Sequence, residues 1–285
     1  MLQRFPDRIK LARTADEARA IDASGKLVAF KSIENSYPLG ESVAMLAEFQ
    51  RQGVRLAGPV HTGVNQFADS ATDQPRWRGL SPLGQQWVAE MNRLGMVIDG
   101  SHASDEALEQ MIALSKTPLI LSHSVARAAY DHPRNIDDAH IRQLAKAGGA
   151  VCFSTIFLSE MHMDGEREAL FDQIEAIGTL SPQEQLRLGR RWHELNQTTP
   201  VWSTSFDQYM AALLHTIEVA GVDHVCFGAD FDGGGIDGIP DITGLPRVTQ
   251  RLKAAGYSDA DLAKIWSGNV LRILGQAEAY ARSAR

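Results

Sequence analysis

The sequence predicts an α/β fold in which parallel strands close into a barrel surrounded by helices. Short apolar runs alternate with amphipathic helical patterns along most of the chain, which is typical of a parallel sheet covered by helices. Nearly every apolar run also ends in a residue able to do chemistry, as expected at the carboxyl ends of barrel strands. No glycine-rich phosphate loop follows a strand at the start of a helix, so an open doubly wound sheet is disfavoured.

The bulk composition is that of one globular domain. The chain has 285 residues, of which 44% are hydrophobic, and a net charge of −7. The charge forms no long acidic or basic block, which argues against nucleic acid and against an anionic membrane surface as partners. No apolar run approaches the ~18 residues of a membrane-spanning helix, and the N-terminus MLQRFPDRIK lacks a signal-peptide core. We therefore expect one α/β-barrel domain over residues 1–285, located in the cytoplasm.

Six apolar runs are predicted as strands, because they are short, rich in apolar and β-branched residues, and end in polar ones. The first, KLVAFKSIE, is the only strand that we expect before residue 35. The six runs end near Glu34, Val60, Ser101, Ser122, Thr155 and Ala229.

Helical patterns separate these strands, and several carry start signals. Ser81 and Pro82 suit the cap and the first position of one helix, and Ser104 caps the next, where two acidic residues follow it. Residues 157–200 break the alternation: they hold helical patterns, including a capping box that begins at Ser181, and no strand run. We interpret them as a helical insertion. The other helices are expected over residues 41–53, 137–149 and 206–221, and from residue 258 onward.

The two cysteines, Cys152 and Cys226, each lie inside an apolar run, GAVCFS and HVCFGAD. Buried free thiols are the favoured interpretation, because cysteine packs as a small hydrophobe. Neither a disulfide framework nor a cysteine-based zinc site is indicated.

Three histidines and two acidic residues stand at the predicted strand ends: Glu34, His61, His102, His123 and Asp230. His102 and His123 follow neighbouring strands and are each directly preceded by a serine, so we expect their imidazoles to share one metal ion. Neutral imidazole and carboxylate suit zinc well. Glu34 could add an oxygen ligand, and Asp230 could either bind the metal or take a proton from water bound to it.

Other interpretations of these residues stay open. A single histidine at a strand end is more often a hydrogen-bonded structural residue, and His61, which follows a weak strand, favours that interpretation by itself. Residues 230–241, DFDGGGIDGIPD, hint at a calcium loop, but Gly234 stands where such a loop needs an oxygen ligand. We therefore interpret them as a glycine-rich turn.

At these residues the sequence resembles the membrane dipeptidase (renal dipeptidase) family of zinc metallopeptidases, especially the bacterial branch in which IEN-YP-G follows a bridging glutamate. The resemblance covers nearly the whole chain, in the stretches SIENSYPLG, GLSPLGQQWVAEMNRLGMVIDGSHAS, LSKTPLILSHS, DHPRNIDD, FGADFDGG and SGNVLRIL. It implies a (β/α)8 TIM-type barrel with two zinc ions bridged by a glutamate. It also implies the hydrolysis of dipeptides through a metal-activated hydroxide, often with a D-residue tolerated on the C-terminal side.

By motif, Glu34 matches the bridging glutamate, and His102 and His123 match the ligands of the second zinc. The first strand of the family carries His-x-Asp for the other zinc, but residues 1–33 contain no histidine. The six predicted strands also fall two short of a closed eight-stranded barrel. Both gaps are explained if the chain begins at an internal methionine and lacks its first two βα units, roughly 60–100 residues. We then expect two exposed sheet edges and at most one well-liganded zinc site.

By the same match, His61 contacts the substrate and the tetrahedral intermediate, and Asp230 contacts the substrate and moves a proton. Arg134, in HPRN, holds the substrate carboxylate, a task that suits the two parallel hydrogen bonds of a guanidinium. The predicted function is therefore a zinc-dependent dipeptidase with a dipeptide substrate, in a family whose members are often homodimers. Two alternatives remain: a barrel metal-hydrolase such as an amidase or lactonase, which has no need of Arg134, and a catalytically impaired truncated remnant.

Overall fold

A parallel sheet forms the centre of the molecule. The structure is a computed structural model that describes residues 2–163, 165–175, 177–199 and 201–284. Parallel pairing joins β3 to β4 to β5 and β6 to β7 to β8, and a parallel bridge between Asp99 and Ile120 connects the two groups. These strands are β3 (Lys31–Ile33), β4 (Val54–Ala57), β5 (Val97–Ile98), β6 (Ile120–Ser124), β7 (Ala150–Phe153) and β8 (Val225–Phe227).

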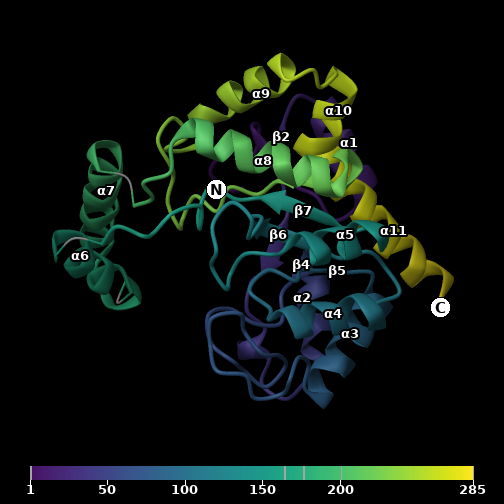
Figure 1. The fold of residues 1–285 in the computed structure, drawn as a ribbon. Helices are drawn as coiled ribbons and strands as arrows, with labels where there is room; N and C mark the ends of the chain where they lie inside the picture. Colours follow the sequence, from purple (N-terminus) through teal and green to yellow (C-terminus); the bar gives the residue numbers. More distant parts are fainter. Residues whose placement is uncertain (1, 164, 176, 200, 285) are drawn as a thin grey trace.

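These strands stand side by side in chain order with helices between them, as expected of a βα barrel (Figure 1). The predicted α/β class is confirmed. Within the part of the chain that the structure describes, β3 and β8 each pair with a neighbour on one side only. The closure of the barrel, and the two missing βα units, therefore stay predictions.

The N-terminal region holds a strand that the sequence pattern did not predict. Strand β1 (Ile9–Leu11) pairs in parallel with β2 (Leu27–Ala29), and helix α1 (Ala15–Ala23) joins them. The expectation of a single strand before residue 35 was wrong. The three residues of β1 have a lysine at their centre and form no apolar run, so only the pairing with β2 reveals them. The predicted strand over residues 26–34 is also divided, because its first half pairs with β1 and its second half with β4.

The predicted helix starts are confirmed where a local signal marks them. The side-chain oxygens of Ser81, Ser104 and Ser181 each accept a hydrogen bond from a backbone N–H in the first turn of the helix. Ser181 also forms the expected capping box with Glu184. None of the described helices is long and apolar enough to cross a membrane. Beyond α1 the helices are α2 (Met45–Arg51), α3 (Pro82–Leu94), α4 (Asp105–Leu114), α5 (Asp138–Lys146), α6 (Gly165–Glu175), α7 (Pro182–Thr198), α8 (Phe206–Ala220), α9 (Leu245–Ala254), α10 (Asp259–Ala263) and α11 (Asn269–Ser283), with short 3-10 segments at Tyr37–Leu39, Ile177–Thr179, Val222–His224 and Ile242–Gly244 and a π segment at Lys264–Gly268.

The sheet is buried on both faces, which is why its strands read as apolar runs. Successive side chains of a strand point to opposite faces, so Ile98, Leu121 and Val151 pack with α3, α4 and α5 in one core cluster. The neighbouring strand positions, Val97 and Ile120 among them, pack instead against α11. The C-terminal helix therefore covers the face opposite the outer helices.

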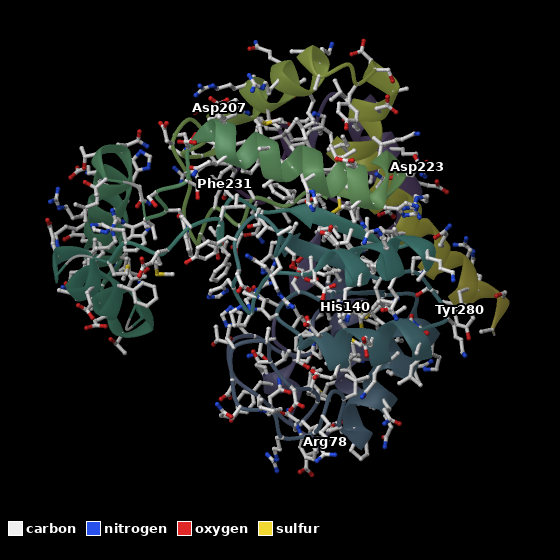
Figure 2. The ribbon with its side chains drawn as sticks, in the orientation of Figure 1. Arg78, His140, Asp207, Asp223, Phe231 and Tyr280 are labelled. Carbon is white, nitrogen blue, oxygen red and sulfur yellow. A yellow bond between two sulfur atoms is a disulfide. The ribbon has the colours of Figure 1, made fainter. Side chains whose placement is uncertain are left out.

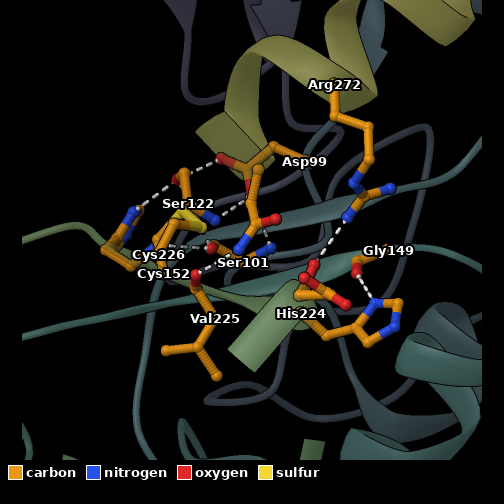
Figure 3. Close-up of a disulfide and its surroundings, with 12 residues drawn as sticks. Asp99, Ser101, Ser122, Gly149, Cys152, His224, Val225, Cys226 and Arg272 are labelled. Carbon is orange, nitrogen blue, oxygen red and sulfur yellow. Dashed lines mark hydrogen bonds between the residues drawn. A yellow bond between two sulfur atoms is a disulfide. The ribbon is translucent and has the colours of Figure 1, made fainter. Parts of the chain in front are cut away.

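The two cysteines are joined, contrary to the free thiols expected from the sequence. Cys152 on β7 and Cys226 on β8 are register partners, with Cα atoms 4.0 Å apart, and form a disulfide (Figure 3). Both are buried, so the predicted burial is confirmed. An apolar run indicates burial but not which residue lies opposite, because opposition depends on the strand register.

Helices α6 and α7 stand apart from the sheet and its helices (Figure 1). They account for the helical patterns over residues 157–200, and pack on each other through a small core of Leu170, Leu188 and Leu195. They follow β7, so they extend from the loops at the carboxyl ends of the strands. That end carries the candidate site.

Candidate metal centre

The strand ends bring the predicted site residues together. Glu34 directly follows β3, His123 lies within β6, and His102 and Asp230 lie in the turns after β5 and β8. His102 and Asp230 have φ angles of 68° and 57°, in the left-handed region that residues other than glycine rarely adopt. Strained backbone persists only where the surrounding structure holds it in place, and it is found most often at functional sites.

Three ligand-type atoms form a small triangle. The His102 Nε2 atom lies 2.9 Å from His123 Nε2 and 3.1 Å from Glu34 Oε1, and His123 Nε2 lies 3.3 Å from the same oxygen. Atoms bound to zinc at about 2.0–2.1 Å in a tetrahedral arrangement stand about 3.3–3.4 Å apart. The triangle therefore fits three ligands of one zinc-sized ion after adjustments of a few tenths of an ångström.

His61 and Asp230 lie beside this triangle rather than in it. His61 Nε2 is 3.8 Å from Glu34 Oε1, its ring centroid is 4.2 Å from that of His102, and its side chain is 42% exposed. The Oδ2 atom of Asp230 is 3.9 Å from His123 Nε2. A molecule bound at the triangle would meet both side chains.

The protonation states favour a metal ion. Burial lowers the pKa of His102 to about 4, although its hydrogen bond to Glu34 acts in the opposite direction. The hydrogen bond with His102 contributes most to holding the pKa of Glu34 well below its usual range. At neutral pH the site thus offers a neutral imidazole and an ionised carboxylate, the forms that bind metals. Burial also raises the pKa of Asp230, to about 6.

Two residues that the sequence did not single out support the site from behind. The buried carboxylate of Asp99 accepts a hydrogen bond from the Ser122 hydroxyl, and the Ser122 Oγ atom lies 2.8 Å from His123 Nδ1. Asp99 Oδ1 also accepts the backbone N–H groups of Ser101 and Ser122, at 3.0 and 2.9 Å (Figure 3). The signal for Ser122 in the sequence is the serine that directly precedes each of the two histidines.

Arg134 is a buried cation with an incomplete set of partners. Its side chain donates to Ser124 Oγ at 3.1 Å and to the His123 carbonyl at 2.7 Å. Its Nε atom is buried without an acceptor, and no carboxylate among the described residues reaches ion-pair distance. Burial lowers the Arg134 pKa to about 10, so it remains charged at neutral pH. Asp99, Asp230 and Glu34 offset its charge from beyond ion-pair distance, so an anionic group placed directly against the guanidinium would stabilise it further.

A second group of ligand-type side chains already has hydrogen-bond and ion-pair partners. Asp105, Asp137 and His140, the last labelled in Figure 2, lie within ligand distance of one another. Arg127 binds the Asp105 carboxylate with two hydrogen bonds of 2.9 and 3.0 Å and lies 3.7 Å from Asp137. His140 is hydrogen-bonded to Asp137 and to Glu109. These atoms form a salt-bridge network, and a metal ion would have to displace the guanidinium.

The chain is similar to known proteins over its whole length. The family model "Membrane dipeptidase (Peptidase family M19)" matches residues 1–285. The chain belongs to the membrane dipeptidase family. Dipeptidase tcpJ of Claviceps purpurea is 30% identical over 289 residues, which cover all of this chain and 59% of that protein. The chain thus spans about three-fifths of the length of this curated relative.

Solved structures of the membrane dipeptidase family share the fold. The probable dipeptidase PvdM from Pseudomonas aeruginosa has a TM-score of 0.81 and 31% identity, over 98% of this chain and 76% of that one. A metallo peptidase from Rhodobacter sphaeroides, liganded with a phosphinate mimic of the dipeptide L-Ala-D-Ala, has a TM-score of 0.74 and 28% identity, over 95% and 69% of the two chains. The predicted family is therefore confirmed, and with it membership in a family of metallopeptidases.

Proposed function

We propose that this chain is a zinc-dependent dipeptidase whose metal ion is held by Glu34, His102 and His123. The observation that carries the proposal is the triangle of one carboxylate oxygen and two imidazole nitrogens, with sides of 2.9–3.3 Å. Two imidazoles and a carboxylate are ligands that suit zinc, and three protein ligands leave a fourth position open, as in catalytic zinc sites.

A zinc ion held there would act as a Lewis acid and make water a nucleophile at neutral pH. The protein groups would do the rest. Asp230, on the His123 side of the triangle, would take the proton from the attacking water and return it to the leaving amine. Its pKa of about 6 suits both steps near neutral pH. His61, whose side chain is 42% exposed, would contact the substrate where it enters.

Arg134 supplies the preference for a substrate with a free carboxylate. Its buried guanidinium has no acidic partner within ion-pair distance among the described side chains, and two parallel hydrogen bonds to a carboxylate would complete it. The Rhodobacter relative binds a mimic of the dipeptide L-Ala-D-Ala, which ends in such a carboxylate. A lactonase would not use this charge, so dipeptides are the favoured substrates.

The residues of this chain fit one metal ion and not two. The family resemblance implies a His-x-Asp pair for a second ion, and residues 1–33 contain no histidine. No step is therefore assigned to a second metal. The absence of that pair also keeps the impaired remnant as the alternative function. A homodimer and a cytoplasmic location stay predictions.

Hydrolysis of simple dipeptides tests the proposal. The purified chain should hydrolyse L-Ala-D-Ala or L-Ala-L-Ala when zinc is added, and lose this activity on treatment with a chelator. The His123→Ala variant should be inactive, whereas His193→Ala, at an exposed position of α7, should match the wild type. A wild-type chain that binds zinc at the triangle and hydrolyses neither dipeptide would favour the remnant.

A further inference from the structure

We propose that Asp99 and Ser122 are positioning residues that set the tautomer and orientation of His123, so that it binds metal through Nε2. The inference rests on the proposed metal site and deepens it. Neither residue belongs to the triangle, because each acts through the far side of the His123 ring.

The argument begins with the hydrogen bonds behind His123. The Nε2 atom of this ring faces the triangle, and its Nδ1 atom lies 2.8 Å from Ser122 Oγ. The Ser122 hydroxyl is itself within hydrogen-bond distance of Asp99 Oδ2. The three side chains thus form a line from a buried carboxylate, through a hydroxyl, to an imidazole.

The proton positions in this line follow from its first member. The Ser122 hydroxyl has a single proton, which it donates to Asp99 Oδ2. The Ser122 oxygen can then only accept from His123, which places the imidazole proton on Nδ1. That tautomer leaves Nε2 with its lone pair free for a metal ion.

Asp99 also fixes the backbone around both histidines. Its Oδ1 atom accepts the N–H groups of Ser101 and Ser122, each of which directly precedes a histidine. In turn, Ser101 Oγ accepts the backbone N–H of His123 at 3.2 Å. One carboxylate, only 4% exposed, therefore ties the two Ser-His pairs together at the site.

The two histidines differ in this respect. His102 Nδ1 is buried without a hydrogen-bond partner among the described residues, so no line of this kind fixes its tautomer. Its left-handed backbone and its contact with Glu34 hold its position instead. The inference therefore applies to His123 alone, and a variant at Ser122 should affect the metal through that ring.

Zinc affinity gives the first test, measured by competition with a chromophoric chelator. Ser122→Ala should weaken zinc binding about 10- to 100-fold, as is usual when a hydrogen-bond partner of a metal ligand is removed. Ser122→Thr keeps the hydroxyl and should recover most of the affinity, and Asp99→Asn should weaken binding at least tenfold. The matched control is Ser154→Ala, which removes a buried hydroxyl from the end of β7 that bonds only backbone atoms. Its affinity should equal that of the wild type.

The tautomer gives the second test, and it needs no metal. Nitrogen-15 NMR of the metal-free protein should show the His123 proton on Nδ1. In Ser122→Ala the proton should move toward Nε2, where Glu34 is the remaining acceptor. A wild-type proton on Nε2, or equal zinc affinities of the wild type and Ser122→Ala, would overturn the inference. Equal zinc binding by the wild type and His123→Ala would instead overturn the proposed metal site, and the tautomer would then decide only whether Asp99 and Ser122 orient the His123 ring.

Discussion

Asp230→Asn should stabilise the metal-free protein at neutral pH although it should abolish activity. Burial raises the pKa of Asp230 from 3.8 to about 6, so folding favours its protonated form. The unfolded chain releases the proton first as pH rises, and the native state therefore loses stability between about pH 4 and pH 6. A pKa raised from 3.8 to about 6 corresponds to a loss of up to about 3 kcal/mol in the free energy of unfolding. Asparagine cannot ionise, tolerates the left-handed backbone at this position, and should remove that loss.

Urea unfolding of chelator-treated protein measures this effect. Asp230→Asn should match the wild type near pH 4 and exceed its free energy of unfolding by up to about 3 kcal/mol at pH 7. Asp207→Asn is the control, because that carboxylate is exposed on α8 (Figure 2) and should leave the pH dependence unchanged. An Asp230→Asn protein that is less stable than the wild type at pH 7, or that keeps the same pH dependence, would refute the reasoning.

Three further predictions follow from particular contacts. Arg134→Ala should raise the KM for dipeptides about 10- to 150-fold, because charge-assisted hydrogen bonds contribute about 1.5–3 kcal/mol; an unchanged KM would favour a substrate without a carboxylate. Gly228→Ala should cost about 1–3 kcal/mol, since a Cβ there would stand 1.8 Å from the Ser122 carbonyl oxygen. The control Gly189→Ala, in open space on α7, should gain about 0.5–1 kcal/mol, and a similar loss in both variants would refute the contact. Thiol titration of the protein unfolded without reductant should find no free thiol, because Cys152 and Cys226 are bonded; two thiols would contradict the pairing.

The parts of the fold that the sequence predicts are those with local causes. The helix starts at Ser81, Ser104 and Ser181 depend on hydrogen bonds within the first turn, so the residues that form them are neighbours in the chain. The alternation of apolar runs and helices likewise predicts the order of the strands, since consecutive units of a βα fold lie side by side.

The parts that escaped prediction have causes elsewhere in the chain. Strand β1 exists because it pairs with β2, and its own three residues carry no strand pattern. The disulfide depends on the register of β7 against β8, which a pattern of apolar residues does not set. A one-residue slip of the register would separate the two sulfur atoms.

The candidate site likewise has residues that the sequence predicts and residues that it does not. The convergence of His102, His123 and Glu34 could be predicted, because parallel strand ends meet at one edge of the sheet. The role of Asp99 could not, because its bonds to Ser101 and Ser122 depend on how two turns fold beside each other. Arg134 was found through the family resemblance alone, since its sequence context carries no signal of burial.

Zinc titration of the wild type and His123→Ala tests the central claim most directly. Because Arg127 already occupies the group of Asp105, Asp137 and His140, the wild type should bind one zinc ion per chain tightly at the triangle, and His123→Ala should lose that site. X-ray absorption of the bound zinc should show two imidazole nitrogens and a carboxylate oxygen at about 2.0–2.2 Å. Two tightly bound zinc ions per chain, or one ion that His123→Ala retains with unchanged affinity, would contradict the account.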